Sequence, residues 1–230
     1  LRNARGSISH AGNAGLQLRA GRLDGVQGLI GTTGAANLQL GSADHRKAQL
    51  IASQINLQAV DFDNRGGQLI ASGQQASRID VQRLDNGDDG MLASNGDLGI
   101  SAQHLGNGGG NVQQAGSGSL LISATELQGQ GGNILSNGSL LLRGDITNLS
   151  GATTAAQRVD VQTGDLLNAG GSLTSAGTEA MRLQVARTLD NSAGILGSNG
   201  ALAISSRRLL NNGGSMVAAG SDETSLRIDD

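Results

Sequence analysis

Three consecutive residues, Arg143-Gly144-Asp145, form a tripeptide that integrin-type receptors recognise on their ligands. Their chemistry would be cell attachment through one guanidinium and one carboxylate. The next copy of an internal repeat carries Thr163-Gly164-Asp165 at the same place. This recurrence favours Gly-Asp as a structural solution to a corner, with Arg143 as its exposed neighbour. An attachment site and a structural corner are therefore the two interpretations of this tripeptide.

A second segment, from Asp85 to Gly90, reads Asp-Asn-Gly-Asp-Asp-Gly and resembles part of a calcium-binding loop. Such a loop presents oxygen ligands at alternating positions and closes with a bidentate glutamate. Here Gly87 occupies one ligand position, and Gly96 stands where the glutamate is required. A one-residue insertion in an exposed turn explains the segment better, so we expect no metal site here.

The remaining candidates for catalysis are histidines and carboxylates. His10, His45 and His104 fall at unrelated positions of the repeat, so they predict neither a shared metal site nor a partner for a nucleophile. A β-helical polysaccharide lyase or hydrolase would need clustered carboxylates, usually with aromatic platforms for sugars. The chain has no Tyr or Trp. We expect no catalytic residues, no cofactor and no bound metal.

A degenerate repeat of about twenty residues must position these side chains. Its landmark is a small residue, which recurs about eleven times at spacings of 19 to 23 residues. The landmarks are Gly6, Gly28, Ala48, Gly67, Gly90, Gly110, Gly132, Gly151, Gly171, Gly194 and Gly214. Two positions further on the residue is apolar in every copy except at Thr153, so this position is expected to face inward.

Asparagine recurs three positions before the landmark in seven copies. These residues are Asn3, Asn64, Asn107, Asn148, Asn168, Asn191 and Asn211. Asparagine tolerates the backbone conformations of corners, and its amide can bond the coils above and below. We therefore interpret all seven as structural residues of an amide ladder.

Each copy also alternates apolar and polar residues with a period of two, as in Leu38 to Leu40 and Ile55 to Leu57. Alternate side chains of a strand point to opposite faces. Three short strands per copy, separated by Gly or Asn corners, predict an all-β parallel β-helix of about eleven coils. Changes in copy length collect in one corner, which predicts an edge of variable loops that is the first candidate for a binding surface.

Composition limits the function further. The 230 residues include 38 glycines and no proline or cysteine, and Phe62 is the one aromatic residue. The net charge of −3 is scattered along the chain, so no nucleic-acid surface is expected. No apolar run is long enough for membrane insertion. The chain starts within a copy, so we interpret residues 1–230 as a single repeat array cut from a longer secreted protein.

The copies with the pattern L-x-N-x-G-G-x-I-x-S-x-G-x-L-x-L resemble the haemagglutinin repeats of filamentous haemagglutinin and related two-partner-secretion exoproteins. Residues 127–142 and 166–220 fit the pattern best. The resemblance implies a right-handed β-helical fibre on the surface of a Gram-negative bacterium, secreted through a dedicated outer-membrane transporter.

Such fibres are adhesins that bind receptors or glycans on host cells, or stalks that carry contact-dependent growth-inhibition toxins. The secretion domain of the family carries Asn-Pro motifs, and this chain has no proline. The resemblance therefore implies a shaft segment of an adhesin, with the toxin-delivery stalk as the alternative. A β-helical polysaccharide-degrading enzyme is the lesser alternative.

Overall fold

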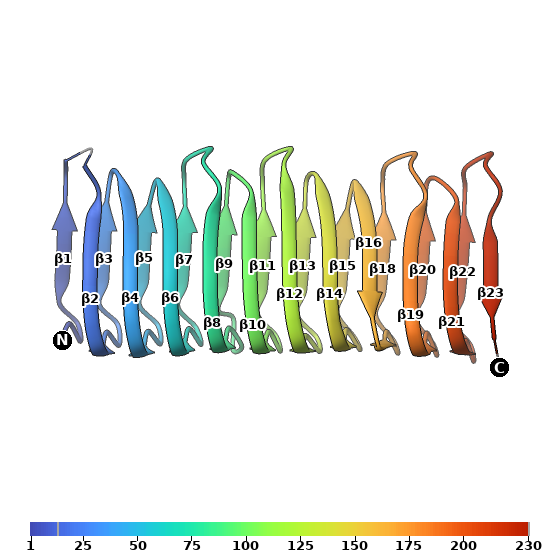
Figure 1. Ribbon diagram of the computed structural model, residues 1–230, viewed down its shortest axis with the longest axis horizontal. Helices are drawn as coiled ribbons and strands as arrows, with labels where there is room; N and C mark the ends of the chain where they lie inside the picture. The colour runs from blue at the N-terminus through green and yellow to red at the C-terminus, as the bar shows by residue number, and fades with distance from the viewer. Residues whose placement is uncertain (13, 230) are drawn as a thin grey trace.

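Short and long strands alternate along a straight rod, with the long strands in front and the short strands behind them in Figure 1. The computed structural model describes residues 1–12 and 14–229, in which all regular elements are strands. The short strands are β1 (Ser7–His10), β3 (Leu29–Thr32), β5 (Gln49–Ala52), β7 (Gln68–Ala71), β9 (Met91–Ser94), β11 (Asn111–Gln114), β13 (Asn133–Ser136), β15 (Thr153–Ala156), β18 (Ser172–Ser175), β20 (Ile195–Ser198) and β22 (Ser215–Ala218).

The other strands form the front of the rod. They are β2 (Leu16–Asp24), β4 (Ala35–Asp44), β6 (Gln54–Asp63), β8 (Ser77–Asp85), β10 (Leu98–Gly106), β12 (Ser119–Gln128), β14 (Ser139–Asn148), β16 (Arg158–Thr163), β17 (Asp165–Leu167), β19 (Met181–Asp190), β21 (Leu202–Leu210) and β23 (Ser225–Ile228). The short strands make an 11-stranded sheet. The other strands make a 12-stranded sheet, in which β17 pairs with β14 and β19.

Each strand pairs in parallel with the equivalent strand of the next coil. Leu50 of β5, for example, is the partner of Ile30 in β3 and of Leu69 in β7, and all three are buried. Like side chains therefore stack in columns along the rod at about 4.8 Å. This parallel stacking confirms the predicted β-solenoid of about eleven coils.

The third strand of each coil is fused with the second, which differs from the expected three separate strands. In β6 the buried positions Ile55 and Leu57 are followed by Phe62, so the inward face changes from odd to even residues within one strand. The third corner is thus a bend in a continuous ladder and needs no loop. Only around Gly164 is the ladder interrupted between two separate strands, β16 and β17, among the described residues.

A four-residue turn leads from each long strand to the next short one. Its fourth residue donates a backbone hydrogen bond to the first, as from Gly67 N to Asn64 O at 2.9 Å. The turn between β8 and β9 is one residue longer, and both Asp88 and Asp89 have a positive φ there. This extra residue is the insertion predicted within the segment from Asp85 to Gly90.

The side chain of the first residue of this turn points into the rod. In successive coils these side chains form a buried column. Asn64 Nδ2 donates to Asn86 Oδ1 at 2.7 Å, and Asn86 Nδ2 donates to Asn107 Oδ1 at 2.8 Å. A second run links Asn168 to Asn191 at 2.8 Å and Asn191 to Asn211 at 2.7 Å. Each of these amides also donates to a backbone carbonyl of its own turn, and all except Asn211 donate to one in the next coil, as Asn64 Nδ2 does to Met91 O at 3.3 Å.

Two of the seven asparagines assigned to the amide ladder are not linked into it. Asn3 begins its turn, but Gly25 takes the equivalent position in the next coil, and Asn3 Nδ2 donates to Leu29 O at 3.1 Å.

Asn148 lies outside the column altogether. Leu149, fully buried, takes the position expected for Asn148, because Ala152 and not Gly151 is the fourth residue of that turn. Asn148 ends β14, and its Oδ1 accepts a hydrogen bond from Ser150 N at 3.1 Å. The positive φ of Gly151 explains the one-residue error, since glycine also suits the third position of the turn.

Sequence reasoning also missed two members of the column. Asn86 escaped notice because the inserted residue moves it one place away from the landmark Gly90. His45 holds the column position in the coil before that of Asn64, and its Nδ1 is 2.8 Å from Asn64 Oδ1. Its ring packs against Phe62 with centroids 5.4 Å apart.

The loop from each short strand to the next long strand varies in length, as predicted. In the structure these loop lengths recur in a fixed sequence. The loops of four successive coils contain two, one, five and three residues: 33–34, 53, 72–76 and 95–97. The same four lengths recur 104 residues later, at 137–138, 157, 176–180 and 199–201. The chain thus contains two similar blocks of five coils, whose uneven loops are visible along the upper edge of Figure 1.

The turn that carries the amide column has no room for a methyl group at Gly110. A Cβ there would overlap Asn86 O and approach Asn107 Oδ1 to 2.9 Å. We expect Gly110→Ala to lower the free energy of unfolding by about 3 kcal/mol, because backbone and ladder must both shift. Gly31→Ala is the control, since an added Cβ there meets nothing within 4 Å. Equal stability of the two variants in urea denaturation would contradict this packing.

The buried His45 makes stability depend on pH. Burial lowers its pKa below the usual value, although the hydrogen bond with Asn64 opposes this shift. In the unfolded chain His45 is therefore protonated near pH 6.5, whereas in the folded chain it stays neutral until the pH is lower. As the pH is lowered from 6.5 toward the pKa of the folded state, the free energy of unfolding should fall by up to about 1.4 kcal/mol per pH unit.

The variant His45→Asn should flatten this slope between pH 6.5 and 5, because its amide can donate to Asn64 Oδ1 without titrating. His104→Asn is the matched control, since His104 lies at the surface with its side chain 57% exposed. Chemical denaturation at several pH values measures both slopes. A wild-type slope in His45→Asn would show that another group causes the dependence.

Candidate binding groove

Amide side chains dominate the outer face of the long-strand sheet at its N-terminal end. Gln17, Asn37 and Asn56 occupy one outward column, because they are register partners in β2, β4 and β6. Gln39 and Gln58 occupy the next column outward. Asn56 Nδ2 donates to Asn37 Oδ1 at 3.0 Å, so these outward-facing amides are ordered by stacking as the buried ones are.

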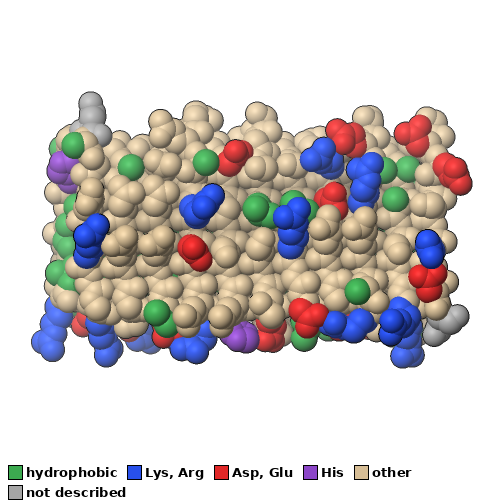
Figure 2. Space-filling model, in the orientation of Figure 1, with side chains coloured by type: hydrophobic (Ala, Val, Ile, Leu, Met, Phe, Trp, Pro, Cys, Tyr) green, Lys and Arg blue, Asp and Glu red, His purple; other side chains and the backbone are tan. Residues whose placement is uncertain are grey.

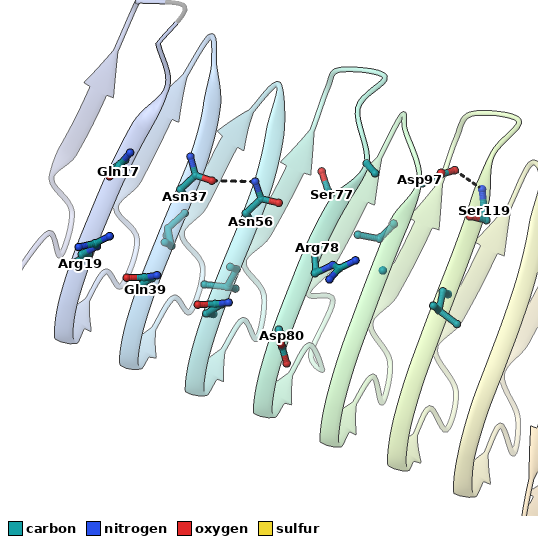
Figure 3. Close-up of a pocket in the computed structure, with 17 residues that line it drawn as sticks. Gln17, Arg19, Asn37, Gln39, Asn56, Ser77, Arg78, Asp80, Asp97 and Ser119 are labelled. Atoms are coloured by element: carbon teal, nitrogen blue, oxygen red, sulfur yellow. Dashed lines mark hydrogen bonds between the residues drawn. The ribbon is translucent and has the colours of Figure 1, made fainter.

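These columns form the floor of a groove of about 730 Å³ that crosses the first six coils (Figure 3). Its volume lies within the range of ligand-binding clefts. The residues that line it run from Gln17 in β2 to Leu121 in β12. The groove therefore follows the axis of the rod and suits an extended ligand.

Hydrogen bonds to neighbouring coils hold the rim of the groove. Gln54 Nε2 donates to Ala76 O at 2.6 Å and fixes the end of the five-residue loop before β8. Ser77 Oγ accepts from Ile55 N at 3.1 Å. Further along, Asp97 Oδ1 accepts from Ser119 N at 2.7 Å, as Figure 3 shows. The rim is thus fixed before any ligand arrives.

The groove offers hydrogen bonds with little net charge. Its amides can each donate and accept, while Arg19 and Arg78 add two cations, and Asp80 and Asp97 add two carboxylates. Hydroxyl groups of a glycan or the backbone of an extended peptide match this pattern. None of the lining residues is aromatic, so the groove lacks a stacking platform.

The tripeptide Arg143-Gly144-Asp145 lies within β14, at the bend of the long strand. Arg187 Nη1 donates to Asp145 Oδ1 at 2.7 Å, and its Nη2 donates to Asp145 O at 3.0 Å. The guanidinium also bonds Asp165, with its Nε 2.8 Å from Oδ2, and these hydrogen bonds hold the pKa of Asp165 below its usual range. The tripeptide therefore has a paired carboxylate and no protruding loop.

The two Gly-Asp pairs do not occupy the same place in their coils, contrary to the expectation from the sequence. Arg143 is the register partner of Gln162 and Ile146 that of Asp165, so Asp145 lies beside Gly164. A Cβ at Gly144 would overlap Ala124 O, and one at Gly164 would overlap the Arg187 guanidinium. Arg187 reaches across this one-residue offset and forms ion pairs with both Asp145 and Asp165. This arrangement supports the structural interpretation of the corner.

The other sequence candidates lie apart from one another. Asp85 Oδ1 accepts a hydrogen bond from Gly87 N at 3.0 Å and closes a turn. His10 Nδ1 lies 3.4 Å from Thr32 Oγ1, His45 is buried in the column, and His104 Nδ1 lies 3.0 Å from Glu126 Oε2 at the surface. In the part of the chain that the structure describes, no three His, Asp or Glu side chains gather as a metal site would require.

A second hollow lies on the last segment of the long strands, between Ala43 and Gln128. Charged residues stack there, and Arg83 and Asp61 form an ion pair. Arg46 and Arg65 bridge the stacked carboxylates Asp44, Asp63 and Asp85, of which Asp63 and Asp85 line the hollow. Hydrogen bonds from Arg46 lower the pKa of Asp44. Figure 2 shows charged side chains along this lower edge of the rod.

A model of the haemagglutinin repeat family matches residues 1–78 and 182–226, together just over half of the chain. The chain belongs to the haemagglutinin repeat family. No curated protein and no solved structure matches it. The repeats of this family are structural and adhesin-like, and the proteins that carry them are extracellular or cell-surface proteins of the filamentous haemagglutinin type.

The haemagglutinin repeat extends further in the structure than in the family match. Residues 79–181 lie outside the match, yet their strands continue both sheets in the same parallel register. The whole described rod therefore consists of one kind of coil, as a shaft requires. Among residues 1–12 and 14–229 there is no helix with the length and hydropathy needed to span a membrane.

Because Arg187 binds Asp145, we expect the tripeptide not to support integrin-type attachment. Wild-type chain and Asp145→Glu, coated at equal density, should retain equal numbers of integrin-bearing cells. The control Asp165→Glu changes the other carboxylate that Arg187 binds. A loss of attachment in Asp145→Glu, but not in Asp165→Glu, would establish the tripeptide as an attachment site.

Proposed function

We propose that this chain is a shaft segment of a secreted filamentous adhesin, which attaches a Gram-negative bacterium to host cells. In this proposal the parent protein leaves the bacterium through a two-partner outer-membrane transporter. The observation that carries the proposal is membership in the haemagglutinin repeat family together with an unbroken solenoid.

The energetics of the coil support a shaft. A single coil cannot shield its inward Leu, Ile and Val side chains, and burial of each is worth about 1.5–3 kcal/mol. Stacking covers these residues, so the free energy of folding grows with each coil that is added. About eleven coils at roughly 4.8 Å span about 50 Å, and more coils of the same kind lengthen the rod without a new fold.

We propose that the amide groove contributes to attachment by binding host-cell glycans. Asn37, Asn56 and Gln58 present donors and acceptors at the spacing of the coils. Without aromatic stacking the affinity of one groove is expected to be low. Many fibres on one bacterial surface would raise the overall strength of attachment through multivalency.

The same groove supports binding rather than catalysis. Glycoside cleavage requires two carboxylates that cooperate across the scissile bond. Asp97 is engaged by Ser119 N at the rim, and Asp80 lies on the floor among amides and arginines. Incubation of the chain with pectin, alginate or chondroitin should yield no product, and measurable cleavage would revive the enzyme alternative.

Cell attachment by beads that carry the chain tests the adhesin proposal. Beads with wild-type protein should bind epithelial cells, and Asn37→Ala/Asn56→Ala should reduce binding about threefold or more. Removing the stacked amides leaves arginine, glutamine and aspartate in the groove but no central donor pair. Prior removal of cell-surface glycans should produce a similar loss.

The matched control is Asn111→Ala/Asn133→Ala. This pair is also stacked, outward-facing and half-buried, with Asn133 Nδ2 bonded to Asn111 Oδ1 at 2.8 Å, but it lies on the short-strand sheet. Its beads should bind as wild type does. No binding by any beads would favour the alternative of a toxin-delivery stalk, in which this segment serves as a spacer.

A further inference from the structure

The outer face of the short-strand sheet carries no charge. None of the residues in its eleven strands, all of which the structure describes, is Asp, Glu, Lys or Arg. The chain as a whole is 15% charged, and the long strands carry arginines and carboxylates on their outer face. Since the outward positions of the short strands are exposed or half-buried, burial does not explain this absence.

The residues on this face are aliphatic or neutral and polar. Ile51, Ile195 and Val217 are 37%, 47% and 52% exposed. Between them lie Ser, Thr, Asn and Gln side chains such as Gln113 and Asn133. Hydroxyl and amide groups both donate and accept hydrogen bonds, so each can bond to a residue of its own kind.

Comparison of the two five-coil blocks shows that the face stays uncharged even where its individual residues change. Eight outward positions in β3, β5, β7 and β9 correspond to eight in β13, β15, β18 and β20, and all eight pairs differ in residue type. None of these differences introduces a charge. On the long-strand sheet the same comparison changes Asn56 to Asp160 and Gln39 to Arg143.

We propose that this uncharged face binds the same face of a second copy of the chain, so that two rods lie side by side. In a dimer with a two-fold axis, the same surface of each copy forms the interface. If that surface is strongly charged, like charges of the two copies come close together. A neutral face avoids that repulsion and the cost of burying unpaired ions. The amide and hydroxyl groups of this face can form hydrogen bonds with the amide and hydroxyl groups of the second copy.

The area of the face is sufficient for such a dimer. Eleven strands at about 4.8 Å, each four residues of about 3.3 Å, cover roughly 650 Å² on each rod. Contact between two rods would then bury about 1,300 Å² in total, within the range of stable interfaces. Two sheets can pack face to face at about 10 Å, as in a β-sandwich. This inference concerns the fibre itself and does not depend on attachment to host cells.

Sedimentation equilibrium of the 230-residue chain, from about 1 μM to about 500 μM, tests the proposal. The wild type should form a dimer. Gln113→Lys places a charge on β11, the sixth of the eleven short strands, where it would face its own mate. We expect the dissociation constant to rise by about tenfold or more. Ser101→Lys adds the same charge to the exposed face of β10 in the other sheet and should leave the dimer unchanged.

Cross-linking gives a second measurement, because the chain contains no cysteine. After mild oxidation Gln113→Cys should form a disulfide-linked dimer, while Ser101→Cys should form little or no disulfide link between its two copies. A wild type that stays monomeric would overturn the proposal and leave the face to a different partner. Equal dimers in Gln113→Lys and wild type would overturn it too, as would an open series of oligomers, which indicates end-to-end stacking of the terminal coils.

Discussion

The parallel, in-register ladder between coils is the constraint on which the rest of the structure depends. It places each side chain about 4.8 Å from its equivalents in the coils before and after. A position can therefore hold only residues that tolerate a stacked neighbour of similar kind. Leucine stacks in the interior, as at Leu50 and Leu69, and asparagine stacks because each amide donates to the next, as from Asn64 to Asn86. The column ends where Leu149 or a glycine replaces the amide.

This constraint acts unequally on the corners. The turn after each long strand contains the buried amide column and its backbone hydrogen bond, so its length is nearly constant. The opposite corner leaves the ladder and returns to it through exposed loops, which can lengthen without moving the core. The recurrence of loop lengths after 104 residues shows that two blocks share one scaffold. Their outer faces have nevertheless diverged, since Asn56 corresponds to Asp160.

Stacking also decides where charge can lie. Carboxylates in neighbouring coils repel one another unless a cation reaches both. Arg187 does this for Asp145 and Asp165, and Arg46 does it for Asp44 and Asp63. These bridges lie at the bend and the end of the long strands, on the front and lower edge of the rod. The rod thus has one face with amides and ion pairs and another that is neutral, and the two suit different partners.

The sequence by itself determined the solenoid, the approximate number of coils and the corner in which length varies, because the twenty-residue period and its alternation follow from local pattern. It could not show that the second and third strands are continuous, since a bend leaves no loop to recognise. It misplaced Asn148 and missed Asn86 because glycine suits two positions of the turn, and only the backbone hydrogen bond tells them apart. The amide groove, the pairing of Asp145 with Arg187 and the neutral face join residues from different coils. Tertiary structure alone decides these features, because the register between coils, rather than distance along the chain, sets which side chains meet.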